Sequence, residues 1–387
     1  MRTCTSRLAL LLVLTAVSGA RAVEPTNMQQ AAPIPLVPDG QALATRIIRL
    51  DPSLDHIVSA NAKVTVVKGE NYFGVLEGGT WVPEGKSGYL LFTDFPANVV
   101  YKWAPDAGQM SVFLTKSGYS GNLTEFTGHP ITVQYGAPIY VYDFGANGIE
   151  RDPQGHIVMC AHGDREIVRI EQDGTRSVVA TGYQGARFWH PNEMTIKSDG
   201  AIYITDARPG AANAQDAVPN KFGVFLIKDG SVSLVISGQG HGVALSPDEK
   251  AFYATTYGSQ AIMRYDVKPD DTLENGRVFV DMSGQKGAPN GMAVDREGNV
   301  YSGGPGGLWI MDASGKHIGT IPLPAIPANA VFGGPGLKTL YLMDARNLLQ
   351  VNLKVPGMLL PARLTGASAQ ASAQASAQTS AQTSAQQ

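Results

Sequence analysis

The chain has 387 residues and a formal net charge of -3, with its lysines and arginines scattered along its length. It therefore offers no basic face of the kind that binds nucleic acid or an anionic membrane. Its two cysteines cannot form an intrachain disulfide if the segment that holds Cys4 is removed, because only Cys160 then remains. A domain of about 300 residues buries enough apolar surface to be stable without a disulfide, and we expect Cys160 to be a packed thiol.

The N-terminus has the features of a cleaved export signal. Arg2 and Arg7 are followed by the apolar run LALLLVLTAV and by Ala-Arg-Ala at residues 20–22. This order predicts a secretory signal over residues 1–22 that is cut after Ala22. The alternative is a membrane anchor, but the apolar run is too short to span a bilayer. We therefore expect an exported protein, periplasmic or secreted, in which residues 23–45, rich in Pro and Gln, form a loose leader.

One pattern recurs through the middle of the chain. A polar residue is followed by an apolar stretch, a polar turn and a second strand that often ends on an acid, as in NEMTIKSDGAIYITDA. Five copies begin at Asn147, Asn192, His241, Asn290 and Asn329. Their spacings are 45, 49, 49 and 39 residues. A more divergent copy, EGGTWVPEGKSGYLLFTDF, begins at Glu77. Such a fixed period is typical of a repeat architecture.

Each copy is followed by two alternating segments around a turn, such as IVRIEQDGTRSVVA and VFLIKDGSVSLVI. Asp-Gly between apolar alternations is a hairpin signal, so every copy supplies four antiparallel strands. Six such copies predict an all-β fold, a six-bladed β-propeller, over residues 46–360. An open sandwich is the alternative, although a sandwich needs no fixed repeat.

The last copy lacks its fourth strand, because the chain has LLQVNLKV and then no second hairpin arm. The segment AKVTVV, residues 62–67, precedes the first copy and is predicted to complete the last blade. This pairing would close the ring and remove an exposed edge, so we expect a monomer. The repeats of Ala, Ser and Gln over residues 361–387 predict a disordered tail.

In a propeller, the loops that enter the innermost strands lie at one mouth of the central channel. The residues that start the copies are therefore predicted to form a ring: Glu77, Asn147, Asn192, His241, Asn290 and Asn329. One carboxylate and several amide oxygens are ligands that calcium accepts. The nitrogen of His241 keeps zinc and manganese as alternatives. For each asparagine, the structural alternative is a side chain that caps its own turn.

Several blocks, among them GIERDPQGHIVMCAHGDREIVRIEQDGT, HPNEMTIKSDGAIYITD and PNGMAVDREGNVYSGG, resemble in order the gluconolactonase and senescence-marker-protein (regucalcin) family. The resemblance covers about Lys63 to Val355. It implies a six-bladed propeller with one divalent cation in its channel that hydrolyses a lactone or a related ester. By position, it implies Glu77 and Asn192 as metal ligands and Asn147 as a residue beside the metal and the substrate. Such a metal polarises the carbonyl and activates a bound water.

Two positions depart from the pattern of this family. Thr256 stands where the family has an aspartate that is both ligand and expected base, and Ala161 stands where gluconolactonases usually have a glutamate. A propeller that has lost catalysis and binds a small molecule or a protein is therefore the alternative function. As replacement bases we consider His241, since imidazole titrates near neutral pH, and Asp206. Their structural alternatives are a histidine of the channel wall and a turn-capping acid.

The loop GARFWHPN, just before Asn192, is predicted to lie near the same mouth. The loop offers Arg187 and Trp189 as substrate contacts, or it simply packs over the channel. Outside the loop, Asn290 and Thr256 are further candidates for substrate contacts. The chain has no GxSxG motif, so a serine-hydrolase mechanism has no support.

Overall fold

The structure is a computed structural model that describes residues 38–358, apart from residues 70–71, 86–87, 127–129, 136, 207–221, 239, 256–259 and 345. Residues 130–135 and 137–140 are described by their backbone alone. The predicted signal, most of the predicted leader, the predicted tail and Thr256 lie outside the described residues. No helix of the described part is long and apolar enough to cross a membrane.

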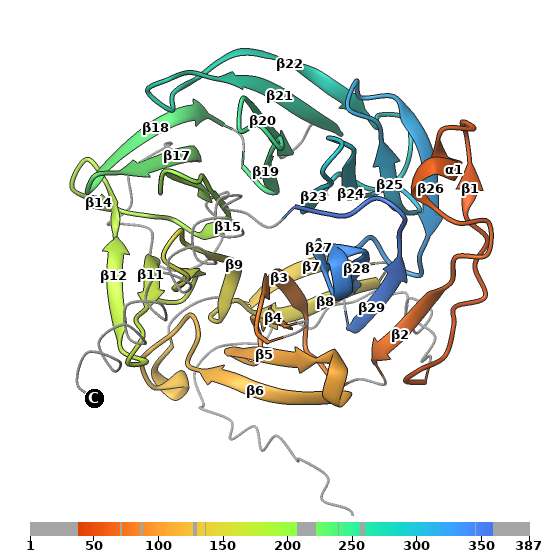
Figure 1. Ribbon diagram of the computed structural model, residues 1–387. Helices are drawn as coiled ribbons and strands as arrows, with labels where there is room; N and C mark the ends of the chain where they lie inside the picture. Colours follow the sequence, from red (N-terminus) through yellow and green to blue (C-terminus); the bar gives the residue numbers. More distant parts are fainter. Residues whose placement is uncertain are drawn as a thin grey trace, which may run out of the picture. The chain divides into compact units, whose positions relative to one another are not determined.

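Six antiparallel sheets surround one axis and form the predicted six-bladed propeller; each blade has four strands, and one sheet gains a fifth strand from outside the repeat (Figure 1). The strands of the first three blades are β3 (Leu76–Val82), β4 (Tyr89–Asp94), β5 (Val99–Ala104) and β6 (Gln109–Thr115); β9 (Ala146–Arg151), β10 (Ile157–Ala161), β11 (Glu166–Ile170) and β12 (Arg176–Ala180); and β15 (Pro191–Ile196), β16 (Ile202–Asp206), β17 (Gly223–Lys228) and β18 (Ser231–Ser237). Those of the last three are β19 (Val243–Leu245), β20 (Ala251–Thr255), β21 (Ala261–Val267) and β22 (Leu273–Asp281); β23 (Met292–Val294), β24 (Val300–Gly304), β25 (Gly307–Met311) and β26 (His317–Pro322); and β27 (Asn329–Gly333), β28 (Thr339–Asp344), β29 (Asn347–Asn352) and β2 (Val64–Lys68).

The innermost strands of the blades contact one another in a closed circuit. β3 contacts β9, and the contacts continue through β15, β19, β23 and β27 back to β3. Glycines allow this close approach. A Cβ on Gly78 would lie 2.3 Å from the carbonyl oxygen of Asn147, and a Cβ on Gly242 would lie 2.3 Å from that of Asn290. No residue with a side chain fits at these two contacts without moving the backbone.

The N-terminal strand closes the ring, as predicted. β2 pairs antiparallel with β29, with Val64 opposite Val351 and Val66 opposite Leu349, and it becomes the outermost strand of the sixth blade. The segment before β2 lies beside this strand, because the N–H of Leu43 donates to the carbonyl oxygen of Val64 at 2.8 Å. The boundary predicted after residue 45 thus falls inside a segment that contacts the propeller.

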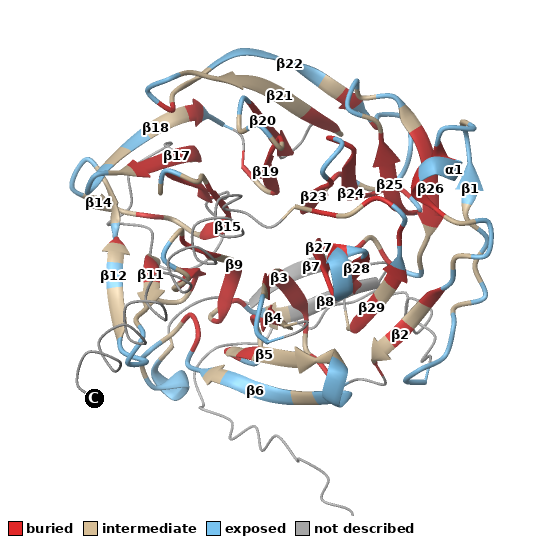
Figure 2. Ribbon diagram, viewed as in Figure 1, coloured by how far each residue is buried: buried red, intermediate tan, exposed pale blue. Residues whose placement is uncertain are grey.

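Buried apolar side chains gather between neighbouring blades. At the junction of the sixth and first blades, Trp81 stacks on Tyr341 with ring centroids 5.8 Å apart. Cys160 is fully buried in the cluster between the second and third blades, which confirms the packed thiol. The innermost strands are buried, whereas the outermost strands expose many of their residues (Figure 2). Each blade therefore depends on both neighbours for its core.

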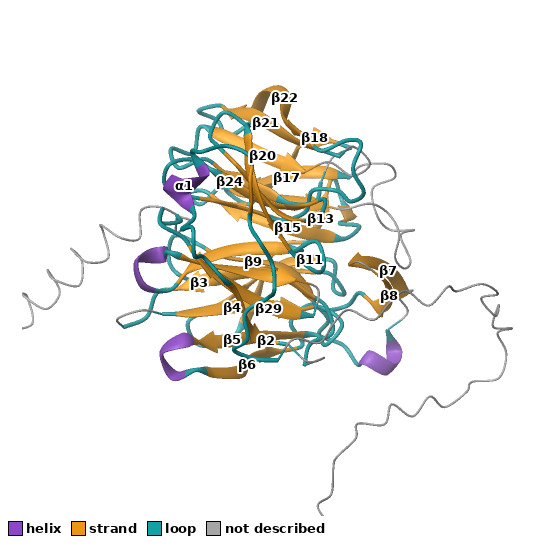
Figure 3. Ribbon diagram, turned by 90° about the vertical axis from the view of Figure 1, so that its right-hand side faces the viewer, coloured by secondary structure: helices purple, strands orange, loops and turns teal. Residues whose placement is uncertain are grey.

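Some elements lie outside the repeat. The hairpin of β7 (Pro130–Tyr135) and β8 (Ala137–Tyr142) is inserted between the first two blades and leads through Asp143 into β9. It therefore lies on the side where the innermost strands begin, at one face of the blades (Figure 3). The other such elements are β1 (Ile48–Arg49), which pairs with β26, α1 (Leu54–Ile57), η1 (Pro105–Ala107), η2 (Leu123–Glu125), β13 (Gly182–Tyr183), β14 (Ala186–Arg187) and η4 (Pro335–Leu337).

Candidate functional site

The residues that start the repeat copies share one end of the channel. Within the first two residues of innermost strands lie Glu77, Asn147, Asn192 and Asn329, while His241 and Asn290 stand just before β19 and β23. Because these strands contact one another in a closed circuit, residues that are far apart in the sequence come together here. Glu77, Asn147 and Asn192 are 5%, 3% and 6% exposed, so this end of the channel is enclosed.

Two buried threonines hold the starts of the innermost strands. The hydroxyl of Thr93, in β4, donates to the carbonyl oxygen of Asn147 at 2.8 Å. The hydroxyl of Thr205, in β16, donates to the carbonyl oxygen of His241 at 2.8 Å. Each bond joins the second strand of one blade to the first strand of the next. The ring residues are therefore positioned by the neighbouring blade as well as by their own.

The acids that end the second strands cap the loops that enter the innermost strands. Asp94 accepts a hydrogen bond from the backbone N–H of Gly74 at 2.8 Å. Asp206 accepts from the backbone N–H groups of Trp189, at 2.8 Å, and His190, at 2.5 Å. Burial raises the pKa of Asp206 to about 6. Both oxygens of Asp206 thus serve a turn, and its predicted role as catalytic base stays a prediction.

The asparagines of the ring differ in what their side chains do. The Oδ1 atoms of Asn290 and Asn329 accept from the next backbone N–H, at 3.0 and 2.9 Å, as the turn-capping alternative expects. The Oδ1 of Asn147 is buried and has no hydrogen-bond partner among the described residues. A buried carbonyl oxygen without a partner is costly. Asn147 therefore offers an acceptor to a ligand.

The channel carries several carboxyl groups. Burial, together with the charges of Glu77 and Glu150, raises the pKa of Glu193, the neighbour of Asn192, to about 8. Three carboxyl groups thus lie close enough along the channel to interact. Together with the unpartnered oxygen of Asn147, this gives a set of hard oxygen donors that a divalent cation such as calcium accepts.

Beyond the ring, the channel contains a cavity of about 90 Å³ whose lining is mostly apolar with a few polar side chains. Glu150, Glu193 and Thr195 are among its lining residues. Thr80 donates to Glu150 at 2.7 Å, and the side-chain amide of Asn329 donates to Glu193. A cavity of this size has room for several water molecules beside its polar side chains.

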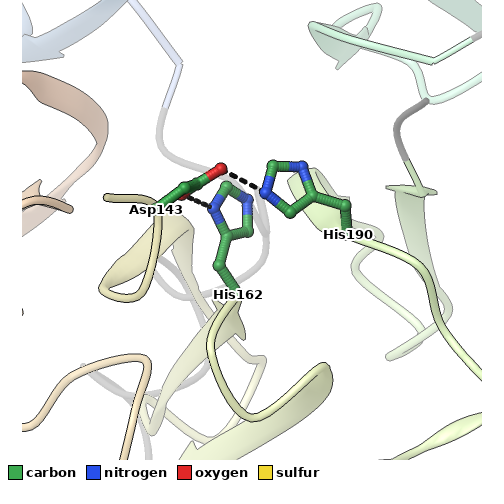
Figure 4. A group of neighbouring side chains, drawn as sticks. All are labelled: Asp143, His162 and His190. Carbon is green, nitrogen blue, oxygen red and sulfur yellow. Dashed lines mark hydrogen bonds and ion pairs between the residues drawn. The ribbon is translucent and has the colours of Figure 1, made fainter. Parts of the chain in front are cut away.

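A second group of chemically active side chains, which the sequence analysis missed, lies at the same end of the blades. Asp143 follows β8, His162 follows β10 and His190 precedes β15 (Figure 4). One oxygen of Asp143 accepts from Nδ1 of His162, and the other pairs with Nε2 of His190. The two imidazole rings are stacked with centroids 3.9 Å apart. We refer to these three residues as the Asp-His-His cluster.

Burial and mutual contacts set the charges of the Asp-His-His cluster. Burial favours the neutral form of Asp143, but the two imidazoles outweigh it and hold the pKa of this carboxyl well below its usual range. At His162 burial outweighs the carboxylate and lowers the pKa. At His190 the carboxylate outweighs burial and raises the pKa. The carboxylate therefore favours a charged imidazole at His190 more than at His162.

His241 lies near this cluster and is partly buried. Burial, together with the charges of His162 and His190, lowers the pKa of His241 to about 4. Its imidazole is therefore neutral at neutral pH, but its pKa lies well below the near-neutral value on which its predicted role was based. Its predicted role as general base stays a prediction.

The predicted substrate contacts of the loop before Asn192 have structural partners. The guanidinium of Arg187 lies 3.4 Å from the carboxylate of Glu166, and it donates to the carbonyl oxygen of Asp164. The backbone of Trp189 is held by Asp206. These bonds hold the loop against the second and third blades, close to the Asp-His-His cluster. Roles of Arg187, Trp189, Asn290 and Thr256 in substrate binding stay predictions.

Comparison with known proteins finds similarity along most of the chain. Residues 75–346 match the model of the SMP-30/gluconolactonase/LRE-like region. A gluconolactonase from Zymomonas mobilis is 33% identical over 330 residues, which are 81% of this chain and 87% of that protein. A pentonolactonase from Haloferax volcanii is 25% identical over 276 residues, 70% of this chain and 81% of that protein. The solved structure of a gluconolactonase from Xanthomonas campestris has a TM-score of 0.66 at 24% identity and covers 82% of this chain and 99% of its own.

Proposed function

Because the chain belongs to the SMP-30/gluconolactonase/LRE-like family, we propose that it is a cation-dependent lactonase that opens a lactone or a related ester at the mouth of its channel. The observation that carries the proposal is the meeting of Glu77, Asn147 and Asn192 at one end of a closed circuit of strands. The names of two relatives, a gluconolactonase and a pentonolactonase, support a lactone as the substrate.

In this proposal Glu77 and Asn192 hold one divalent cation, with calcium as the first candidate, and Asn147 lies beside it. When bound, such a cation supplies a Lewis acid for the carbonyl of the lactone and lowers the pKa of a bound water. Burial raises the pKa of Glu193 to about 8 and that of Glu150 to about 7, and a cation bound in the channel would favour their ionised forms. The threonine bonds to the backbone of Asn147 and His241 keep the mouth in place while substrate enters.

Hydrolysis also requires a base that takes a proton from the attacking water. His241 is our first candidate, because its imidazole is neutral at neutral pH and stands at the ring position of the fourth blade. Asp206 is the weaker candidate, because both of its oxygens accept backbone N–H groups.

The decisive experiment is a hydrolysis assay of the purified mature protein on sugar lactones, aliphatic lactones and aryl esters. We expect turnover of at least one lactone, loss of that turnover after treatment with EGTA, and recovery on addition of calcium. Glu77→Gln keeps the shape of the side chain and removes its charge, and it should lower kcat/KM by about 100-fold or more, as loss of a metal ligand does. Glu297→Gln, at an exposed position, should have no effect.

Turnover that persists in the chelated protein would contradict cation dependence. A folded wild-type protein that hydrolyses none of the compounds, with or without calcium, would instead favour a binding propeller without catalysis.

We also propose that the protein is exported, with support from the pattern of Arg2 and Arg7, an apolar run and Ala-Arg-Ala before Val23. N-terminal sequencing of the protein from the periplasm or the medium should begin at Val23. A chain that stays in the cytoplasm and begins at Met1 would contradict export.

A further inference from the structure

We propose that the Asp-His-His cluster is a second metal centre, selective for a transition metal that binds nitrogen, with zinc as the first candidate. Asp143, His162 and His190 each offer one ligand atom, and these atoms lie within 4.8 Å of one another. The proposal does not depend on lactonase activity, because it rests on the three side chains and their surroundings.

The donor set separates this centre from the oxygen ring. Two imidazoles and one carboxylate are typical ligands of zinc and related transition metals, whereas calcium takes oxygen ligands. A tetrahedral ion with bonds of about 2.0–2.2 Å keeps its ligand atoms about 3.3–3.6 Å apart. The ligand atoms of the cluster all lie within 4.8 Å of one another, which is close to this spacing. Calcium at Glu77 and Asn192 and zinc at the cluster would therefore be bound by different chemistry.

The segments that bring the three ligands together are joined to one another by hydrogen bonds. The N–H of Gly163, next to His162, donates to the carbonyl oxygen of Phe144, next to Asp143, at 3.2 Å. A Cβ on Gly163 would lie 2.6 Å from that oxygen, so the contact requires glycine.

The segment of His162 is also joined to the segment of His190. The guanidinium Nε of Arg165 donates to the carbonyl oxygen of Phe188 at 2.7 Å. The backbone N–H of His190 is held by Asp206. The ligand-bearing segments are thus connected before any ion binds, as a preorganised metal site requires.

Burial and charge also suit a metal at this position. Asp143 and His162 are 4% and 2% exposed, and the side chain of His190 is 16% exposed, which leaves an entry path on its side. Phe95 packs beside His162 with ring centroids 6.4 Å apart and excludes water from the inner side. The carboxylate of Asp143 would supply negative charge to a divalent ion at this position.

The test is metal binding by the full mature protein after removal of bound metals with EDTA and dialysis. Equilibrium dialysis against zinc, with millimolar calcium present, should yield one zinc per chain by elemental analysis. Cobalt(II) should replace zinc and give the intense visible absorption of a four-coordinate site. Zinc should also raise the Tm of the wild-type protein, since it binds the folded state.

Variants locate the site. His162→Ala and His190→Gln should each raise the Kd for zinc by about 100-fold or more and remove the cobalt spectrum. The matched control His56→Ala, at an exposed histidine, should bind zinc as the wild type does. Glu77→Gln should retain zinc, so that failure of the oxygen site and failure of the cluster remain distinguishable.

His190 lies at the more exposed side of the cluster. His190→Gln is therefore the variant to measure if His162→Ala does not fold. Less than stoichiometric zinc in the wild type, or zinc that is unaffected in a folded His190→Gln, would overturn the proposal and leave a hydrogen-bonded group without metal.

Discussion

A single hydroxyl, that of Thr205, joins three segments at the mouth of the channel. It accepts from the backbone N–H of Glu193 at 2.9 Å and donates to the carbonyl oxygen of His241 at 2.8 Å. Thr205 is fully buried, so water cannot replace it in either bond. One side chain therefore fixes the backbone beside Asn192 and beside His241, in two neighbouring blades.

We predict that Thr205→Val lowers the free energy of unfolding by about 1–3 kcal/mol, because valine keeps the shape and leaves two buried backbone groups without partners. Urea denaturation measures the change. Thr175→Val, at an exposed threonine that bonds Asp173, is the control and should stay within about 0.5 kcal/mol of the wild type. An equal decrease in unfolding free energy in the two variants would show that the hydrogen bonds of Thr205 do not stabilise the fold more than an exposed hydrogen bond does.

Asp344, at the end of β28, gives a pH-dependent prediction. It is 1% exposed, and burial raises its pKa from 3.8 to about 7. The folded state therefore keeps a proton that the unfolded state releases near pH 4. The stability from this proton is present below about pH 4 and is lost as the pH rises to about 7.

Asp344→Asn removes this titration. Between pH 5 and pH 8 the wild type should lose on the order of 2 kcal/mol more unfolding free energy than the variant, since one pKa unit corresponds to about 1.36 kcal/mol. Denaturation curves at both pH values measure the difference. Parallel pH profiles would mean that Asp344 is already ionised in the folded protein.

At the scale of the elements, we predict that the closing strand β2 contributes to the stability of the propeller. Val66 is 2% exposed and packs in the cluster between the fifth and sixth blades. Val66→Ala should lower the unfolding free energy by about 1–3 kcal/mol, because it opens a cavity where the ring closes. Val278→Ala, on the outermost strand β22 and 58% exposed, removes the same atoms and should cost less than about 0.5 kcal/mol. A similar small effect at both sites would show that β2 contributes little to closure.

The repeating elements could be predicted from the sequence, because every copy has two strands about a polar turn and then a hairpin. The turn is stabilised locally: Asp152 and Asp295 each accept from the backbone N–H four residues later, at 2.8 and 2.9 Å. Such short-range signals survive divergence. The hairpin β7–β8 has the same alternation but no copy elsewhere, and the repeat does not place it. Its position depends on tertiary packing, such as that of Val141 against Phe95 and Val75.

The meeting of the ring residues at one end of the channel was predictable to the same extent as the repeat, whereas their roles stay predictions. Glu77 and Asn192 stand at the start of their copies, and the closed circuit brings those starts together. Asn147 and Asn290 both begin their copies with Asn-Gly, but their side chains differ in the structure. The Oδ1 of Asn147 has no partner among the described residues, whereas the Oδ1 of Asn290 accepts from the next backbone N–H. The Asp-His-His cluster was missed because Asp143 follows the inserted hairpin, outside any copy.

At the scale of the whole molecule, the proposed function depends on closure of the ring. Glu77 belongs to the first blade and Asn192 to the third, with the second blade between them. A cation held by both residues would join blades that have no other direct strand pairing in the described sheets. Ligand binding and ring stability should therefore be coupled, because an ion that binds the closed ring stabilises it.

The most direct test of this view is to locate the cation. Crystals of the mature protein grown with calcium, measured at a wavelength where calcium scatters anomalously, should show a peak about 2.3–2.6 Å from an oxygen of Glu77 and from Oδ1 of Asn192. The same crystals of Glu77→Gln should show no such peak. Side chains of Glu77 and Asn192 that point away from each other, with no density between them in an active protein, would contradict it.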